Sequence, residues 1–234
     1  MPINGTAFFK PLCYAVDTRL MEVKILKPII FVRTSFMKYY KGADGDTPVN
    51  GGSYVAENGT GHESYNFDAV AYDDGTAECY GFAMLAGGGN SEPQLKIENI
   101  VGCEAFKKEE AIDNVIVVWC AKEEKNIRVV GFYKNATVFR YSKYLDFEGG
   151  YRQWFNFVAD KKDCVLLPYQ ERFATNKWFV PTSGKNRRDF GFGRSSIWYG
   201  GSKTIDKDEI AYVENMIKNI ESYNGENWID VKGE

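Results

Sequence analysis

The stretch Val115–Arg140, VIVVWCAKEEKNIRVVGFYKNATVFR, decides the fold expected for this chain. Two runs of β-branched and aromatic residues flank a short charged turn at 122–126, and this pattern is typical of an antiparallel β-hairpin. The first run ends in Trp119, and the second carries Tyr133 and Asn135. Aromatic rings beside polar strand ends are a common way to build a site for a flat ligand.

Further strands are predicted on both sides of this hairpin, whereas helical periodicity is confined to the C-terminal end. The predicted strands are 28–34, 76–85, 95–101, 114–121, 127–141 and 153–167. Apolar residues recur at helical intervals from Ile210 to Ile220, after Asp206 and Glu209 at capping-box spacing, so we expect one amphipathic helix at 207–222. Many strands, few helices and no alternation of strands with helices predict a mainly β (α+β) fold, either a curved antiparallel sheet or a barrel.

Length and composition favour one large domain. With 234 residues, we expect an N-terminal arm at 1–27 and a single domain at 28–234, with a C-terminal lobe from about residue 150. The net charge of −3 gives no global sign of nucleic-acid binding, although a local basic patch would suffice. Five cysteines without a C-x-x-C motif predict reduced, mostly buried thiols. The absence of a signal-peptide pattern and of an apolar stretch of membrane-spanning length predicts a cytoplasmic protein without a membrane partner.

The single histidine, His62, limits the catalytic chemistry that the chain can carry. An HNH nuclease and most zinc hydrolases need several histidines, and no G-x-S-x-G motif accompanies His62 as a serine triad would require. We therefore expect no catalytic residue, no metal and no cofactor. The alternative is a nuclease or other hydrolase that uses His62, Glu63 and nearby carboxylates of the glycine-rich loop 43–75.

Aromatic residues interleaved with cations favour a different class of function. Lys38 and Lys41 flank two tyrosines, and the segment 185–201 combines arginines, small polar residues and Trp198 in a glycine-rich context. Stacking rings beside guanidinium or ammonium groups are what single-stranded or flipped-out bases require.

Several of these segments resemble a known family. They are FVRTSFMKYYKG (31–42), NGGSYVAENGTGHESYNF (50–67), YGF (80–82), VVWCAK (117–122), VVGFYKNATVFR (129–140) and FGFGRSSIWYGG (190–201). Together they resemble the N-terminal region of bacterial restriction-associated proteins, which in many members precedes an HNH endonuclease. That region is similar to EVE and YTH domains of the PUA-like group of small β-barrels. The resemblance implies a reader that accepts a modified base in an aromatic cage after flipping it from a duplex. Because one histidine cannot supply an HNH site, cleavage would need a partner nuclease.

The leading hypothesis is therefore a nucleic-acid-binding module, for DNA rather than RNA, that recognises a modified base. Trp119, Tyr133 and Trp198 would stack on the base, and Asn135 and Ser195 would bond its edge. The phosphate contacts would come from Lys38, Lys41, Lys134, Arg187, Arg188 and Arg194. A third hypothesis is a small-ligand-binding β-barrel for a flat metabolite, which an acidic or neutral rim would favour.

Overall fold

The computed structural model describes residues 15–17, 24–49, 61–85, 92–184, 188–201 and 206–231. The strands are β1 (Ala15–Asp17), β2 (Lys24–Leu26), β3 (Ile29–Thr34), β4 (Ala69–Ala71), β5 (Ala77–Gly81), β6 (Ala111–Glu123), β7 (Asn126–Asp146), β8 (Arg152–Asp160), β9 (Cys164–Leu166), β10 (Phe179–Val180) and β11 (Ile197–Trp198). The α-helices are α2 (Glu171–Ala174) and α3 (Lys207–Glu221). Short 3-10 helices are η1 (His62–Tyr65), η2 (Ile97–Asn99), η3 (Glu104–Phe106), η4 (Lys161–Asp163), η5 (Asn176–Trp178) and η6 (Trp228–Asp230).

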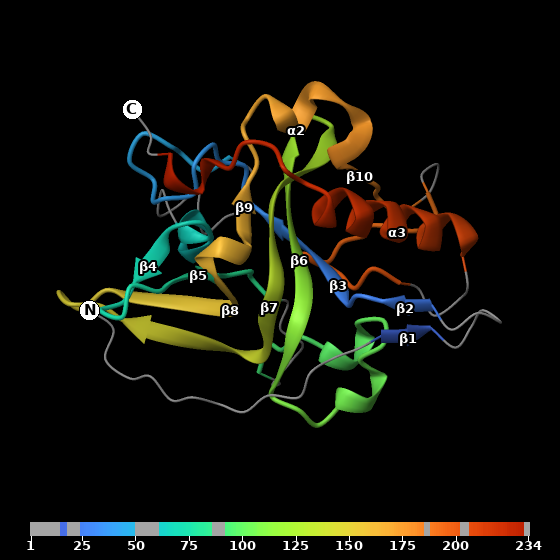
Figure 1. Ribbon diagram of the computed structural model, residues 1–234, viewed down its shortest axis with the longest axis horizontal. Helices are drawn as coiled ribbons and strands as arrows, with labels where there is room; N and C mark the ends of the chain where they lie inside the picture. Colours follow the sequence, from blue (N-terminus) through green and yellow to red (C-terminus); the bar gives the residue numbers. More distant parts are fainter. Residues whose placement is uncertain are drawn as a thin grey trace.

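A nine-stranded sheet organises the molecule, and the β6–β7 hairpin lies at its centre (Figure 1). The strand order is β11-β3-β6-β7-β8-β5-β4, with β9 and β10 also paired to β7. The sheet is open, so it does not close into a barrel. It is also mixed, because β3 runs parallel to β6, and the prediction of a wholly antiparallel sheet is wrong for this pair. The reason is connectivity: residues 35–110 lie between β3 and β6, and only strands joined by a tight hairpin must run antiparallel.

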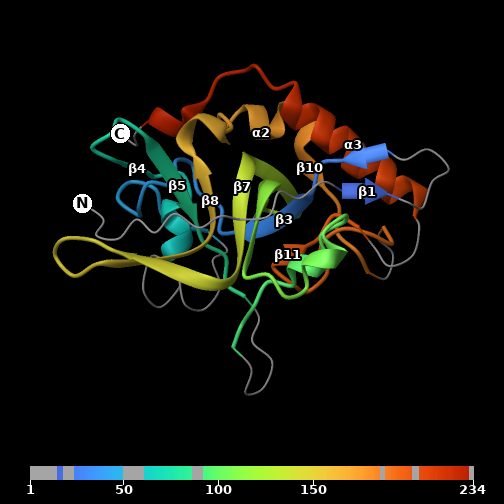
Figure 2. The same cartoon turned by 60° about the horizontal axis from the view of Figure 1, so that its bottom comes forward.

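The two faces of β6 enter two different hydrophobic cores, because strand side chains alternate in direction. Val115, Val117 and Trp119 belong to the first core, together with Phe67, which follows η1, and Cys79 of β5. Ile116 and Val118 belong to the second core, which α3 covers (Figure 2). Burial on both faces explains why the VIVVW run is continuously apolar instead of alternating with polar residues.

Two asparagines mark irregularities in the central hairpin. Asn114 and Asn135 have positive φ values of 63° and 40°, a left-handed conformation that asparagine tolerates better than most residues. The β6–β7 register shifts beside both positions, between Ile112 and Val115 and between Val115 and Val117. Asn135 therefore occupies a β-bulge, which bends the strand and increases its twist.

Most predicted elements are present, with two differences. The strand at 28–34 is confirmed, and the helix is confirmed with Asp206 as its N-cap, accepting from the amides of Asp208 and Glu209. The predicted strand at 95–101 is wrong, because Ile97 and Ile100 reach the core from a 3-10 turn. The predicted strand at 153–167 is two strands, which η4 separates. The predicted division near residue 150 falls at the tip of the β7–β8 hairpin, between two paired strands.

Three of the cysteines, Cys79, Cys120 and Cys164, are free and buried, as expected. Cys103 is disulfide-bonded, so the prediction of a fully reduced set is wrong at that position. Within the described ranges, no helix has the length and apolar character needed to cross a membrane.

Candidate functional site

Trp119 and Tyr133, two of the predicted stacking residues, lie fully buried in the first core. Their rings meet edge to face with centroids 5.4 Å apart. The Tyr133 hydroxyl donates to the main-chain oxygen of Asn66, next to η1. The packing is tight, since a methyl group on Gly81 would lie 2.2 Å from Cζ2 of Trp119. These two aromatics are therefore core residues close to η1, and neither ring is exposed to a ligand.

Trp198 lies on the opposite face of the sheet, in the second core. It stacks on Phe31 with ring centroids 4.3 Å apart, and its indole nitrogen donates to Oε1 of Glu209 at 3.2 Å. The sheet therefore separates Trp198 from Trp119 and Tyr133. The three rings therefore do not form the predicted cage. Side-chain direction alternates along a strand, and the spacing of residues in the sequence does not show which face of the sheet each ring occupies.

The predicted base-edge residues are also apart from each other. Asn135 is exposed at its bulge, where Oδ1 accepts from Nζ of Lys27 at 2.9 Å, and Lys27 also pairs with Glu221 of α3. Ser195 is exposed before β11, and its Oγ accepts from the amide of Ile197 at 3.0 Å. Both polar groups serve local backbone or helix contacts.

The predicted phosphate-binding cations fall into two groups. Lys134 lies over Phe132 and Arg188 over Phe190, and both rings belong to the second core. Lys38 and Lys41 lie in the loop after β3, and Arg194 is exposed just before β11, the neighbour of β3. Arg187 lies outside the described residues.

A different set of aromatic and polar residues lies around η1, between the end of β3 and the start of β8. We call it the His62 cluster, and it consists of His62, Glu63, Tyr65, Phe82, Tyr151 and Gln153. The His62 ring lies 5.3 Å from Phe82 and 6.4 Å from Tyr151, and Tyr65 lies 5.8 Å from Tyr151. His62, Tyr65 and Phe82 are half-buried, whereas Tyr151 is 44% exposed. The cluster thus presents several ring surfaces at the boundary between core and solvent.

Gln153 fixes the position of His62 within this cluster. Its amide nitrogen donates to the His62 main-chain oxygen at 2.8 Å, and its amide oxygen accepts from the Tyr151 hydroxyl at 2.6 Å. The imidazole Nδ1 lies 3.4 Å from the same amide oxygen and 3.5 Å from the Trp154 amide. Burial lowers the pKa of His62, and the contact with Gln153 opposes that shift only in part. The ring is therefore neutral near pH 7.

Glu63 carries a largely buried carboxylate whose Oε2 accepts from the Ser35 amide at 3.2 Å and the Thr34 hydroxyl at 3.4 Å. Burial raises the pKa of Glu63, and the hydrogen bonds from Ser35 and Thr34 lower it by less. No cation pairs with this carboxylate in the described part of the chain. Buried carboxyl groups that lack an ionic partner are costly to keep, and they concentrate at functional sites.

The loop after β3 holds the cluster from one side. The Asp46 carboxylate accepts from the amides of Lys38, Tyr39 and Tyr40 at 2.7, 2.6 and 3.0 Å. The buried guanidinium of Arg172 donates to the main-chain oxygens of Met37 and Lys38 at 2.6 and 2.8 Å. The amide of Gly42 then donates to the Ser64 oxygen in η1 at 3.0 Å. Lys38 and Lys41 are thereby placed on a rigid loop bonded to the cluster.

The sequence hypotheses named two members of the cluster, His62 and Glu63, but for catalysis. Their side chains have separate partners, and no hydrogen bond joins them within the described residues. The described residues also contain no group of three histidine, cysteine, aspartate or glutamate side chains that could hold a metal. Phe82, Tyr151 and Gln153 were missed because they lie far away in the chain. For Phe82 the signal was available, since the YGF segment was singled out beside the segment that carries His62.

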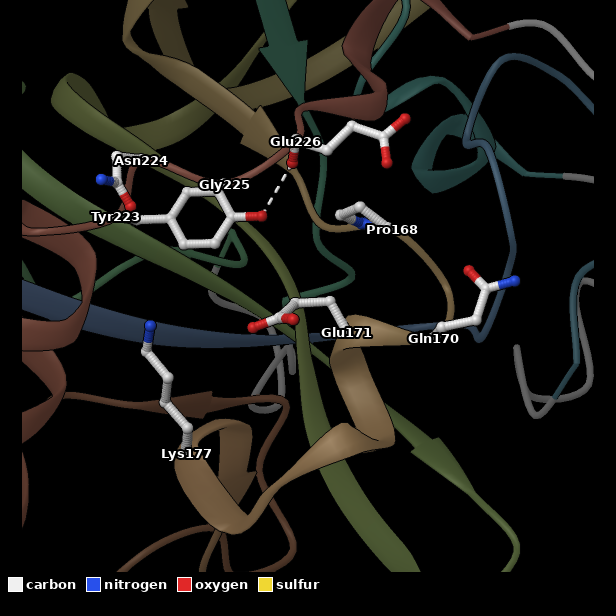
Figure 3. Close-up of a pocket in the computed structure, with 8 residues that line it drawn as sticks. All are labelled: Pro168, Gln170, Glu171, Lys177, Tyr223, Asn224, Gly225 and Glu226. Atoms are coloured by element: carbon white, nitrogen blue, oxygen red, sulfur yellow. Dashed lines mark hydrogen bonds between the residues drawn. The ribbon is translucent and has the colours of Figure 1, made fainter.

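A separate hollow of about 370 Å³ lies between α2 and the segment that follows α3 (Figure 3). It is lined by Pro168, Gln170, Glu171, Lys177, Tyr223, Asn224, Gly225 and Glu226. Burial raises the pKa of Tyr223 to about 12, and the carboxylates of Glu171 and Glu226 add to this. The ammonium of Lys177 already lies over the Tyr223 ring at 5.4 Å. Two carboxylates on the rim suit a small polar molecule better than a phosphate backbone.

Comparisons with known proteins give no relative for this chain: no family model, curated protein or solved structure matches it.

Proposed function

We propose that this protein binds nucleic acid and holds one extruded base, a modified base in DNA, against the His62 cluster. The observation that supports the proposal is the meeting of half-buried rings around η1, the 3-10 helix that also carries Glu63, whose largely buried carboxyl group has no ionic partner in the described residues. An extruded base needs a stacking surface and a hydrogen-bonding group at its edge, and the cluster offers both.

The rings supply the stacking surface. Base stacking on an aromatic side chain contributes about 1–3 kcal/mol per base. Phe82 packs against the His62 ring, Tyr65 packs against Tyr151, and Tyr151 extends the ring surface towards solvent. Trp119 and Tyr133 act indirectly, because they hold Phe82 and η1 in place through Gly81 and Asn66.

Glu63 supplies the polar group. A carboxylate accepts hydrogen bonds from exocyclic amino groups, and a protonated carboxyl group can donate to a ring nitrogen or carbonyl. The raised pKa of Glu63 shows that burial disfavours the charged form in the free protein. A bound base that donates to this carboxylate would offset part of that cost, which makes the edge contact selective for amino-bearing bases.

Phosphate contacts in this proposal are fewer than the sequence suggested. Lys38 and Lys41 belong to the loop bonded to η1, and Arg194 precedes Ser196, whose hydroxyl donates to the Met84 oxygen two residues after Phe82. In this proposal these three cations supply the phosphate contacts. Lys134 and Arg188 instead accompany the second core and lie outside the proposed interface.

The test is fluorescence anisotropy with oligonucleotides that carry methylated, hydroxymethylated or unmodified bases. We expect tighter binding to one modified set, and about a 5- to 150-fold loss of affinity for Phe82→Ala, the range that one stacked ring supplies. Glu63→Gln should reduce the preference among bases more than the overall affinity.

Matched variants separate binding from folding. Glu92→Gln changes an exposed carboxylate, and Tyr223→Phe changes the hollow of Figure 3, so neither should alter binding. Unfolding curves of every variant would identify a loss of fold. Equally weak binding of all oligonucleotides at low and high salt would refute the proposal.

A further inference from the structure

The β7–β8 hairpin projects away from the rest of the molecule, as both ribbon views show (Figures 1 and 2). We call residues 142–156 the hairpin arm. It carries Tyr144 and Tyr151, which are 48% and 44% exposed, and these are two of the four large hydrophobic side chains that are exposed in the described ranges. An exposed aromatic arm of this kind marks an interaction site more often than it stabilises a fold.

The two faces of the arm differ. Tyr144 pairs with Trp154 across the strands, and Arg152 lies 3.9 Å over the Tyr144 ring while it binds Asp146. Since strand side chains alternate, Gln153 points the opposite way, towards His62. The inner face of the arm therefore adjoins the His62 cluster, and the Tyr144 face turns away from it.

The tip of the arm is closed and aromatic. Phe147 and Tyr151 pair through a hydrogen bond from the Phe147 amide to the Tyr151 oxygen at 2.8 Å, with ring centroids 6.1 Å apart. The turn between them is closed by the Gly150 amide, which donates to the Phe147 oxygen at 3.2 Å. Gly149 and Gly150 have φ values of 91° and 83°, which glycine adopts without strain. The tip thus presents two rings on a narrow, ordered turn.

Charge argues against a phosphate-binding role for this tip. The arm contains two cations, Lys143 and Arg152, and two anions, Asp146 and Glu148, so its net charge is zero. Apolar or aromatic side chains without surplus positive charge are better suited to insertion between stacked base pairs than to contact with the phosphate backbone.

We propose that the tip of the arm enters a duplex beside the extruded base and that Phe147 fills the space the base leaves. This inference rests on the proposed function. Tyr151 joins the two sites, since its ring lies 6.4 Å from His62 and 6.1 Å from Phe147. Extruding a base costs a few kcal/mol of stacking, and an inserted side chain restores part of it. The arm therefore acts on duplexes and has no task on strands whose bases are already unstacked.

The test compares Phe147→Ala with the parent protein on a duplex and on the single strand with the same modified base. We expect about a tenfold loss of affinity for the duplex, a weaker fluorescence increase from 2-aminopurine at the extruded position, and unchanged affinity for the single strand. Tyr144→Ala is the control, because it removes an aromatic ring from the far face of the same arm, where Tyr144 is exposed and Phe147 is half-buried, and it should change neither value.

The outcomes separate this inference from the function on which it rests. Loss of duplex affinity alone supports the inserted arm. If Phe147→Ala binds both substrates like the parent while Phe82→Ala weakens both, the arm proposal fails and the function stands. Equal weakening on both substrates by Phe147→Ala would also overturn it, as would a dimer that this substitution dissociates. If the parent protein binds neither substrate, the proposed function itself fails.

Discussion

At the residue scale, the pKa values of His62 and Glu63 are both shifted in the direction that disfavours the charged form. Burial lowers the pKa of His62 and raises the pKa of Glu63, so in both cases the neutral form is favoured relative to an exposed side chain. Neither shift stabilises the folded protein at pH 7. The arrangement is better explained by a ligand that completes the hydrogen bonds of the site than by a contribution to stability.

His62 gives a direct titration test, because it is the only histidine in the chain. Its folded pKa lies below the unfolded value of about 6.5. Between those two values the unfolded chain binds more protons at His62 than the folded protein does. His62 therefore leaves the free energy of unfolding unchanged above about pH 6.5 and lowers it as the pH falls through this window. We expect the single imidazole signal in NMR spectra to titrate below pH 6.5.

His62→Gln removes this titration and serves as its control. The variant should lose less unfolding free energy than the parent when urea curves at pH 5.5 and pH 7.5 are compared. An imidazole that titrates above pH 6.5 would contradict the buried environment described for His62, and it would point instead to stabilisation of the charged ring.

Individual residues also show where sequence reasoning reaches its limit. Trp119 and Trp198 are both tryptophans at strand positions in the resembling segments, yet they enter opposite cores. Face depends on register, which bulges at Asn114 and Asn135 shift, and the local pattern does not specify it. Asn135, in the resembling segment 129–140, has a backbone role that its residue type permits but that the neighbouring residues do not predict.

At the scale of elements, the site depends on close approach between strands and the loops above them. A methyl group on Gly131 would lie 2.4 Å from Cζ of Phe67 and 2.5 Å from the Val165 oxygen. The second contact is with the backbone of β9, which cannot rotate away. Gly131 therefore allows β7 to approach both Phe67, next to η1, and its partner strand.

Gly131→Ala should destabilise the protein by about 3 kcal/mol, the upper end for overpacked cores. Urea unfolding would measure the change. Gly193→Ala is the matched control, because its added methyl group would meet only Oγ of Ser183 at 3.4 Å, and its effect should stay within about 0.5 kcal/mol. Similar stabilities for the two variants would show that β7 and β9 separate easily.

The elements were easier to predict than their contacts. Local signals located the β6–β7 hairpin, β3 and α3, since β-branched runs, a charged turn and an N-cap act over a few residues. The parallel pairing of β3 with β6 and the meeting of η1 with β8 depend on chain reversals across long intervals. The His62 cluster assembles through those long-range contacts, so its members appeared in the sequence as unrelated residues.

At the scale of the whole molecule, one sheet separates two surfaces with different cations. The loop after β3, which is bonded to η1, carries Lys38 and Lys41, and Arg194 precedes β11, whereas Lys134 and Arg188 accompany the second core. The chain as a whole carries a net charge of −3. If the proposed function holds, non-specific attraction to nucleic acid is weak, and affinity comes from base contacts at one face.

This distribution predicts a shallow dependence of binding on salt. Each neutralised phosphate contributes about −0.9 to the slope of log affinity against log salt on duplex DNA, so three contacts give a slope of about −2 to −3. Anisotropy titrations between about 50 and 300 mM KCl, a range that brackets physiological ionic strength, would measure this slope.

The double variant Lys38→Ala and Lys41→Ala should reduce the slope by about 2, whereas the double variant Lys134→Ala and Arg188→Ala should leave it unchanged. A slope near −5 that falls with the second pair would place the nucleic acid on the α3 side of the sheet and contradict the proposed site. The salt slope thus decides which of the two faces the ligand contacts, independently of which base is bound.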